Sequence, residues 1–369
     1  MILRSLRRYP LWWAFASASL LCLLLGLAFP LWEGLAEWWS RYPAAGLRLA
    51  LGGISSLAPF SLFELLIALA VLYGLFLLIF TVVLLCRRER RRRFLRFKAL
   101  YLIPLCVLIC VADLFFLTFS SSYHRRSVAE SMALETEDLS EEDLFFALET
   151  LCAMANEAEA QIPKNEAGES LMPYTEGERA EAVRRAAEAF GKRNPFYQSA
   201  GFRTKSLVSS PLITYTHISG IFGFFTGEAN VNDHYPHFIV TATAAHESAH
   251  ARGIGPENEC NFLAFATLAE SEDPYLAYCG TVFVLDDFIS LCRRLDRDRA
   301  EGVLESLSPT VWRDWEAYSR FFEPYRDSAA AEIADKTNSA YLKSQGQSEG
   351  TLSYSRIIAL CTAYLKSAR

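Results

Sequence analysis

The sequence predicts a mainly α-helical protein with a small β-sheet, in which three N-terminal transmembrane helices precede one outer domain. Three observations support this fold class. The first 119 of the 369 residues contain long apolar runs, helix-start signals dominate the rest, and strand signals are confined to two short segments. We therefore divide the chain into a three-span transmembrane region, residues 1–119, and an outer domain, residues 120–369. With 52% apolar residues, the chain is too hydrophobic for a purely soluble protein.

The predicted spans are three uninterrupted apolar runs, each near or above the ~20 residues needed to cross a bilayer. They cover Leu11–Phe29, Phe60–Cys86 and Ala99–Phe119. The first run is longer than the apolar part of a usual signal peptide, and its cleavage would not change the sidedness of the rest. Asp113 lies inside the third run, where an ionisable group is costly and either has a function or pairs with another helix.

Orientation follows from the basic residues. Eight Lys or Arg lie between Arg87 and Lys98, and Arg4, Arg7 and Arg8 lie near the N-terminus, whereas the segment from Pro30 to Pro59 has only Arg41 and Arg48. The positive-inside rule predicts that the N-terminus and the arginine-rich loop are cytoplasmic and that the outer domain is extracytoplasmic. Residues 1–119 carry a formal charge of +8 and the remainder −14. An acidic outer domain argues against a nucleic-acid partner, so the expected partners are the bilayer and a substrate.

Capping signals predict most helices of the outer domain. Ser140 precedes one amphipathic segment, and Thr175 with Glu178 forms a capping box before another. Further helices are expected to begin near Asp273–Pro274, Ser308–Pro309 and Thr351. The two predicted strand segments are SLVSSPLITYTHI and FGFFTGEANVN. Five cysteines of this domain, an odd number, leave at least one free thiol.

The chemistry is concentrated in TATAAHESAHARGIGPENECNFLAF. His246 and His250 are four residues apart, so on a helix they project from one face, with Glu247 beside them. Pro236 can open this helix and Gly253 can end it in a left-handed conformation. This H-E-x-x-H pattern predicts a zinc ion held by the two imidazoles, with Glu247 as the catalytic general base.

A catalytic zinc site normally has a third protein ligand, which the next helix can supply. Glu257 is the expected ligand, and Asn261, four residues later, is expected to orient a histidine by hydrogen bonding. Glu259 is the alternative ligand. Cys260 alternates with apolar residues in a pattern typical of core packing.

Several segments together resemble the bacterial membrane proteins of domain-of-unknown-function family 3810, which are regarded as zinc-dependent peptidases. The resemblance rests on GIFGFFTGEANVN, AHESAHARGI, ENECNFLAF and AYLKSQGQSEGTLSYSRIIAL, and it covers most of residues 120–369 and the leading membrane helices. More distantly, the pattern after H-E-x-x-H is similar to the third-ligand helix of the gluzincins. The resemblance implies a zincin-like catalytic domain in a bacterial cell membrane, with Glu257 as ligand and Asn261 in support.

Further residues are candidates for contacts to the substrate and the transition state. FFTGEANVN resembles the edge strand of zincins that pairs with an extended substrate, and Glu228, Asn230 and Asn232 would then share one side, either lining the cleft or facing water. His234, His237, Tyr354 and Arg356 are candidate donors to an oxyanion, each with a structural role as the alternative.

These residues favour a membrane-anchored zinc metallopeptidase that hydrolyses peptide bonds outside the cytoplasm. Two alternatives stay open: a catalytically inactive zincin-like module that binds or senses at the membrane, and a zinc amidase acting on cell-wall peptides. The H-E-x-x-H segment lacks an apolar run of spanning length, so we expect a water-exposed cleft with the spans acting mainly as an anchor.

Overall fold

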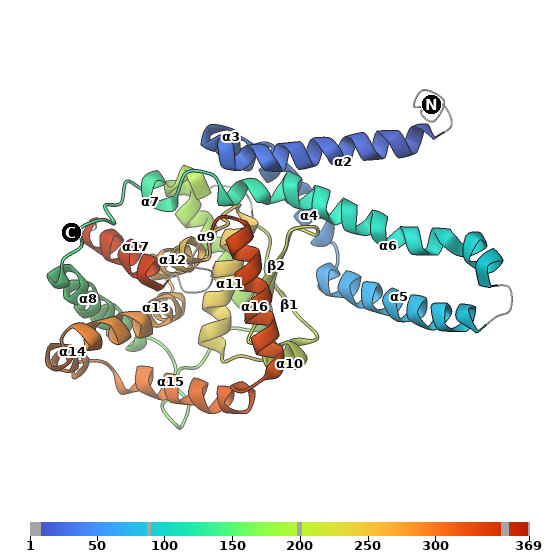
Figure 1. The fold of residues 1–369 in the computed structure, drawn as a ribbon. Helices are drawn as coiled ribbons and strands as arrows, with labels where there is room; N and C mark the ends of the chain where they lie inside the picture. Colours follow the sequence, from blue (N-terminus) through green and yellow to red (C-terminus); the bar gives the residue numbers. More distant parts are fainter. Residues whose placement is uncertain (1–8, 87–89, 198–200, 348–353, 368–369) are drawn as a thin grey trace.

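Three long apolar helices project from one side of a helical domain in the computed structural model (Figure 1). They are α2 (Pro10–Ala28), α5 (Leu62–Leu85) and α6 (Arg90–Thr118). Each contributes to a stretch that is long and apolar enough to cross a membrane. These stretches are Pro10–Leu31, which includes the turn η1, Leu62–Leu85 and Phe97–Thr118. The structure describes residues 9–86, 90–197, 201–347 and 354–367.

A fourth apolar helix, α13 (Pro274–Leu295), also has the length and composition of a span. However, 67% of its most apolar window is buried, against at most 11% in the other three helices. It packs between α8 (Glu141–Glu159) and α12 (Glu257–Ala269), so its apolar surface is part of the domain core.

The predicted capping signals are confirmed at four helices. Ser140 caps α8, Thr175 and Glu178 form the capping box of α9 (Glu176–Arg193), Asp273 caps α13, and Ser308 caps α15 (Pro309–Phe322). The helix expected near Thr351 is α17 (Tyr354–Ser367), and Thr351 lies outside the described residues. Apart from α3 and α4, which are described below, the other helical elements are η1 (Phe29–Leu31), η2 (Ser120–Tyr123), α7 (Val128–Ser131), η3 (Pro195–Tyr197), α10 (Ser210–Ile213), η4 (Thr214–Thr216), α11 (His237–Ala251), α14 (Arg297–Leu304), η5 (Glu323–Tyr325) and α16 (Ala329–Ser344).

The sheet has three strands in the order β1-β3-β2, and the strand prediction is only partly correct. The second predicted segment contributes to the hairpin of β2 (Gly220–Gly223) and β3 (Glu228–Val231). The first contributes only to β1 (Lys205–Ser206), which pairs in parallel with β3. Beyond β1 the chain forms α10 and η4, because Pro211 at the start of α10 favours a helical turn and cannot donate to a sheet ladder.

Two helices that were not predicted occupy the segment between the first two apolar helices. They are α3 (Glu33–Arg41) and α4 (Pro43–Ser55). Helix α4 touches the turn between β2 and β3, since a Cβ on Gly227 would lie 2.6 Å from the Gly52 nitrogen. Gly227 also has φ +70°, so only glycine fits both the backbone conformation and the contact.

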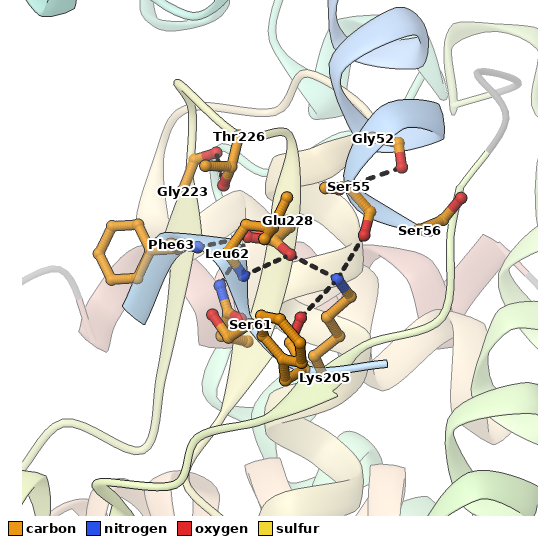
Figure 2. A network of polar contacts seen from close by, with 12 residues as sticks. Gly52, Ser55, Ser56, Ser61, Leu62, Phe63, Lys205, Gly223, Thr226 and Glu228 are labelled. Carbon is orange, nitrogen blue, oxygen red and sulfur yellow. Dashed lines mark hydrogen bonds and ion pairs between the residues drawn. The ribbon is translucent and has the colours of Figure 1, made fainter. Parts of the chain in front are cut away.

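A buried polar network fixes the start of α5 to the sheet (Figure 2). The Glu228 carboxylate accepts hydrogen bonds from the backbone N–H groups of Leu62 (3.0 Å) and Phe63 (2.6 Å). Lys205 donates from Nζ to Glu228 at 2.6 Å and to the carbonyls of Ser55 and Phe60 at 2.7 and 2.9 Å. Helix α5 is therefore joined to the sheet by hydrogen bonds of defined direction, in addition to the connecting chain.

Two arginines connect the same region to the turn between α11 and α12. Arg48 of α4 is buried, donates to the carbonyls of Thr118 and Ser40, and packs against Gly253. Arg125 donates to the Gly253 carbonyl at 3.1 Å and to Glu37 of α3 at 3.2 Å. This turn therefore lies against α3, α4 and the end of α6.

Two polar side chains inside the apolar helices form a hydrogen bond with each other, whereas the cysteines form no disulfide. The Ser19 hydroxyl of α2 donates to the Asp113 carboxylate of α6 at 2.6 Å, so Asp113 pairs with another helix as one of the two interpretations expected. All nine cysteines lie in the described residues, and none forms a disulfide.

Candidate metal centre

The centre is built on α11 and α12, the two helices joined by the Gly253 turn. Pro236 caps α11, which contains no breaker before its last turn, and Gly253 takes the left-handed conformation with φ +88° just after it. This is the helix predicted from the sequence. Helix α12 begins at Glu257, directly after Pro256. Glu257 consequently lies at the helix end that faces the last turn of α11.

The structure brings His246, His250 and Glu257 together. The two Nε2 atoms are 3.1 Å apart, and the Glu257 carboxylate oxygens lie 3.2 Å from His246 Nε2 and 3.6 Å from His250 Nε2. Burial would raise the pKa of Glu257, but the neighbouring His250 and His246 lower it below its ordinary value. Glu257 is therefore a carboxylate at neutral pH.

Hydrogen bonds on the far side of each ring set the histidine tautomers. His246 Nδ1 donates to Asn261 Oδ1 at 2.6 Å, and His250 Nδ1 donates to the Ile254 carbonyl at 2.9 Å. Both Nε2 atoms therefore point at the Glu257 carboxylate and can bind a cation once they carry no proton. Three such atoms at this short range repel one another unless a proton or a metal cation lies between them.

The spacing of these atoms fits a zinc ion. Tetrahedral zinc with bonds of 2.0–2.1 Å places its ligand atoms roughly 3.3 Å apart, and the three observed distances lie on both sides of that value. These three side chains could thus hold such an ion, and all three line a cavity.

Glu247 lies beside this cluster without coordinating it. It is 4% exposed, and its Oε2 atom has no hydrogen-bond partner among the described residues. Burial raises its pKa, the charges of His246 and His250 oppose that shift, and the Glu257 carboxylate adds to it. A buried carboxyl that lines the cavity and has an oxygen without a partner is suited to accept a proton.

Glu259, the alternative ligand, points elsewhere. Its carboxylate accepts a hydrogen bond from the Val128 backbone N–H at 2.9 Å, and burial raises its pKa to about 7. Cys260 is fully buried as its pattern predicted, with Sγ 3.3 Å from His250 Nδ1 on the side of the ring opposite the cluster. Of the two glutamates, only Glu257 is in the cluster.

The strand residues predicted to contact substrate lie outside the cavity. Glu228 binds the start of α5 and Lys205, and the Asn230 amide donates to the Ile221 and Glu228 carbonyls. Asn232 donates to Thr214 and to the Ile218 carbonyl. The segment FFTGEANVN, which contains β3, was predicted to be an edge strand. That prediction was wrong, because β3 is the central strand and β2 lies at the edge.

The other donor candidates are also distant from the cluster. His234 contacts the Tyr325 hydroxyl at 3.0 Å, and His237 is exposed at the start of α11. Arg356 is exposed at the start of α17, and its charge acts on Glu259. The side chain of Tyr354 lies outside the described residues. None of the described side chains among these lines the cavity.

The cavity beside the cluster has a volume of about 970 Å³. It lies between β2, α11, α12 and α16, and η2 completes the wall. Among its lining residues are Phe119, Tyr123, Gly220, Phe222, Phe224, Glu247 and Tyr341. The Tyr341 hydroxyl of α16 is 3.1 Å from that of Tyr123.

Sequence reasoning missed α16 and both tyrosines. The only available signal was local: Ser328 precedes a run rich in alanine and charged residues, a composition typical of a helix. Tyr341 lies at the beginning of the family-like segment AYLKSQGQSEGTLSYSRIIAL, but nothing in that segment indicates that it faces the histidines.

Comparison with known proteins identifies a family. A family model described as "Protein of unknown function (DUF3810)" matches residues 41–362. No curated protein and no solved structure matches the chain. The matched range begins just before α4 and includes α5, α6 and the whole candidate metal centre.

Proposed function

We propose that this chain, which belongs to the DUF3810 family, is a membrane-anchored zinc metallopeptidase that hydrolyses peptide bonds. One observation carries the proposal. Two histidine nitrogens and one carboxylate converge beside a buried glutamate that lines the same cavity and has one oxygen without a partner among the described residues. A purely structural zinc site would have no need of that glutamate.

His246, His250 and Glu257 would hold the ion, oriented by Asn261 and the Ile254 carbonyl. When bound, zinc supplies a Lewis acid that polarises a carbonyl and lowers the pKa of a coordinated water toward about 7. Glu247 would accept a proton from the attacking water and deliver it to the amide nitrogen. The C–N bond breaks, hydroxide adds to the carbonyl carbon, and the products are a carboxylic acid and an amine.

The edge strand β2 supports binding of an extended peptide. Residues Ser219 to Phe222 line the cavity, and in the described sheet one edge of β2 has no strand partner. A Cβ on Gly220 would lie 2.6 Å from a Glu247 oxygen, so this strand passes directly beside the proposed base. A substrate added to that edge would present its backbone to Glu247.

Tyr341 replaces the earlier candidates as the proposed oxyanion donor. Burial raises its pKa to about 12, although the Tyr123 hydrogen bond partly opposes the shift. Its hydroxyl therefore keeps its proton at neutral pH and is available to donate.

The proposed location is the bacterial cell membrane, with the N-terminus cytoplasmic and the metal centre on the outer side. The basic residues before α2 and after α5, with only Arg41 and Arg48 in between, support this orientation. Reporter fusions after residue 98 and after residue 125 should report opposite sides of the membrane. Equal signals from the two fusions would reject it.

The central test uses the purified full chain. We expect about one zinc per chain, and a folded protein without zinc at neutral pH would refute the proposal. Glu247→Gln should retain zinc and lose hydrolysis of a peptide mixture. Glu257→Ala should lose zinc, whereas Glu259→Ala, the matched change two residues away, should keep it.

The same experiment separates the two alternative functions. An inactive module that binds or senses would hold zinc but cut no peptide, and Glu247→Gln would then have no effect. A zinc amidase would release fragments from cell-wall peptides and leave linear peptides uncut.

A further inference from the structure

The candidate metal centre lies at the end of an apolar helix. Helix α6 ends at Thr118, and the ring of the next residue, Phe119, is 5.8 Å from the ring of His250, measured between centroids. The two rings are therefore about as far apart as two successive turns of a helix, roughly 5.4 Å. If α6 crosses the membrane, as proposed, the centre is beside the point where α6 leaves the hydrocarbon.

The cavity wall continues the aromatic surface of α6. Phe119 and Phe222 pack together at 5.3 Å between centroids, and both line the cavity. Phe224, also in the lining, contacts Phe115 of α6 at 5.4 Å. The Thr118 hydroxyl donates to the Phe224 carbonyl at 3.3 Å, which joins β2 and its turn to α6. One wall of the cavity is therefore apolar and adjoins a proposed span.

The second apolar helix begins at the same face of the domain. The turn after β2 contacts the start of α5, where Phe63 packs on Phe225 at 5.3 Å. Glu64 of α5 accepts a hydrogen bond from the Val208 backbone N–H at 2.9 Å. The Val208 and Leu212 side chains are 83% and 73% exposed. Exposed apolar side chains beside the start of a span are suited to contact lipid.

We infer that the substrate is a polypeptide held in the membrane by its own apolar or lipid-attached segment, and that it is cut close to that segment. The inference rests on the proposed function and specifies its substrate class. A tethered chain leaving the bilayer beside α6 would meet the aromatic wall first and could then extend along β2 past Glu247. Tethering also raises the local concentration of substrate at the cavity.

The test uses the full chain loaded with zinc in vesicles of phosphatidylethanolamine and phosphatidylglycerol. Three peptide libraries share one randomised segment of roughly ten residues, which spans about 33 Å when extended. One library follows an apolar helix directly, one follows it after a polar spacer about twice as long, and one has no anchor. We expect the directly anchored library to be cut at least ~10-fold faster than the other two.

Mass spectrometry would place the cuts, which should lie in the part of the segment nearest the anchor. Equal cutting of the unanchored library would overturn the inference while leaving the proposed function intact. If zinc-loaded protein cuts none of the libraries, both the inference and the proposed function are rejected.

A second readout does not depend on catalysis. A photoreactive benzophenone side chain replaces Phe224 in the Glu247→Gln chain, and a matched chain carries it at Tyr215, which is outside the cavity lining. We expect crosslinks from position 224 to the directly anchored library and few from position 215, with zinc content unchanged as the test of folding. Crosslinks to phospholipid alone, or equal crosslinks to the unanchored library, would overturn the inference.

Discussion

Asn261 controls which nitrogen of His246 faces the cluster. Its side-chain oxygen accepts the Nδ1 proton, and that single hydrogen bond leaves the Nε2 lone pair directed at Glu257 and His250. His250 depends instead on a backbone carbonyl, that of Ile254, which no side-chain substitution removes. The two proposed ligands are therefore unequal in how they can be perturbed.

Replacing Asn261 with alanine should weaken zinc binding without removing a ligand. Loss of a hydrogen bond that orients a metal-binding histidine typically costs 10–100-fold in affinity, and we expect a decrease of about that size. Competition with a chromophoric chelator measures it. Asn338→Ala is the control, because Asn338 lines the same cavity from α16; an equal decrease in both variants would show that Asn261 has no orienting role.

The turn between α11 and α12 sets the distance from His250 to Glu257, and two features require glycine at position 253. Its φ is +88°, and a Cβ there would lie 2.3 Å from the Arg48 guanidinium. Gly253→Ala should therefore suffer both backbone strain, of about 1 kcal/mol, and displacement of Arg48. We expect a lower unfolding temperature and weaker zinc binding.

Gly346 provides the matched comparison for that variant. It has a similar φ of +83°, but a Cβ there would meet nothing within 4 Å. Gly346→Ala should show the cost of strain alone, measured by thermal unfolding in detergent, and leave zinc affinity unchanged. If the two variants lose equal stability and both keep zinc, Arg48 does not position the turn.

The Glu228 network predicts a large effect of removing one charge. Glu228→Gln keeps an oxygen for the N–H groups of α5 but leaves the half-buried Lys205 ammonium without its counterion. Breaking a buried ion pair costs about 3–5 kcal/mol, so the unfolding midpoint should fall by several degrees. Glu142→Gln, which breaks an exposed pair with Arg299, should change it little; equal effects would contradict a joining role for Glu228.

Signals within a few residues of each other were sufficient to predict much of the structure. Capping residues located α8, α9, α13 and α15, and the spacing of His246, His250 and Glu257 predicted three side chains that the structure brings together. Such signals are local because a cap bonds to its own first turn and ligands four residues apart share one helix face.

Features that depend on distant contacts were not predicted. Alternation correctly indicates which residues share a side of β3, but it cannot show that β1 covers its other edge and makes β2 the edge strand. For the same reason neither expected position of Glu228 and Asn230, lining the cleft or facing water, is correct, because both are buried and bind α5 and the sheet. Helix α16 closes the cavity only through its tertiary position.

Taken over the whole chain, contacts between residues 1–119 and the outer domain give the N-terminal region more than the mainly anchoring role expected from the sequence. Lys205 and Glu228 bond across the boundary at residue 119, Arg48 packs against Gly253 across it, and Phe119 itself lines the cavity. The family match, which starts at residue 41, also includes these helices. The domain that contains the candidate metal centre is thus completed by residues from before the boundary.

A chain of residues 120–369 alone should consequently fail to form the centre. It would expose the sheet surface that α4 covers, leave the buried Glu228 without its Leu62 and Phe63 donors, and remove Arg48 from the Gly253 turn. We expect this fragment to aggregate or to bind zinc at least ~10-fold more weakly than the full chain, as measured by metal analysis and near-ultraviolet circular dichroism. Co-expression with residues 1–119 should restore zinc binding, because the missing contacts are noncovalent. A monomeric fragment with the zinc affinity of the full chain would instead show that the helices serve only to hold the domain at the membrane.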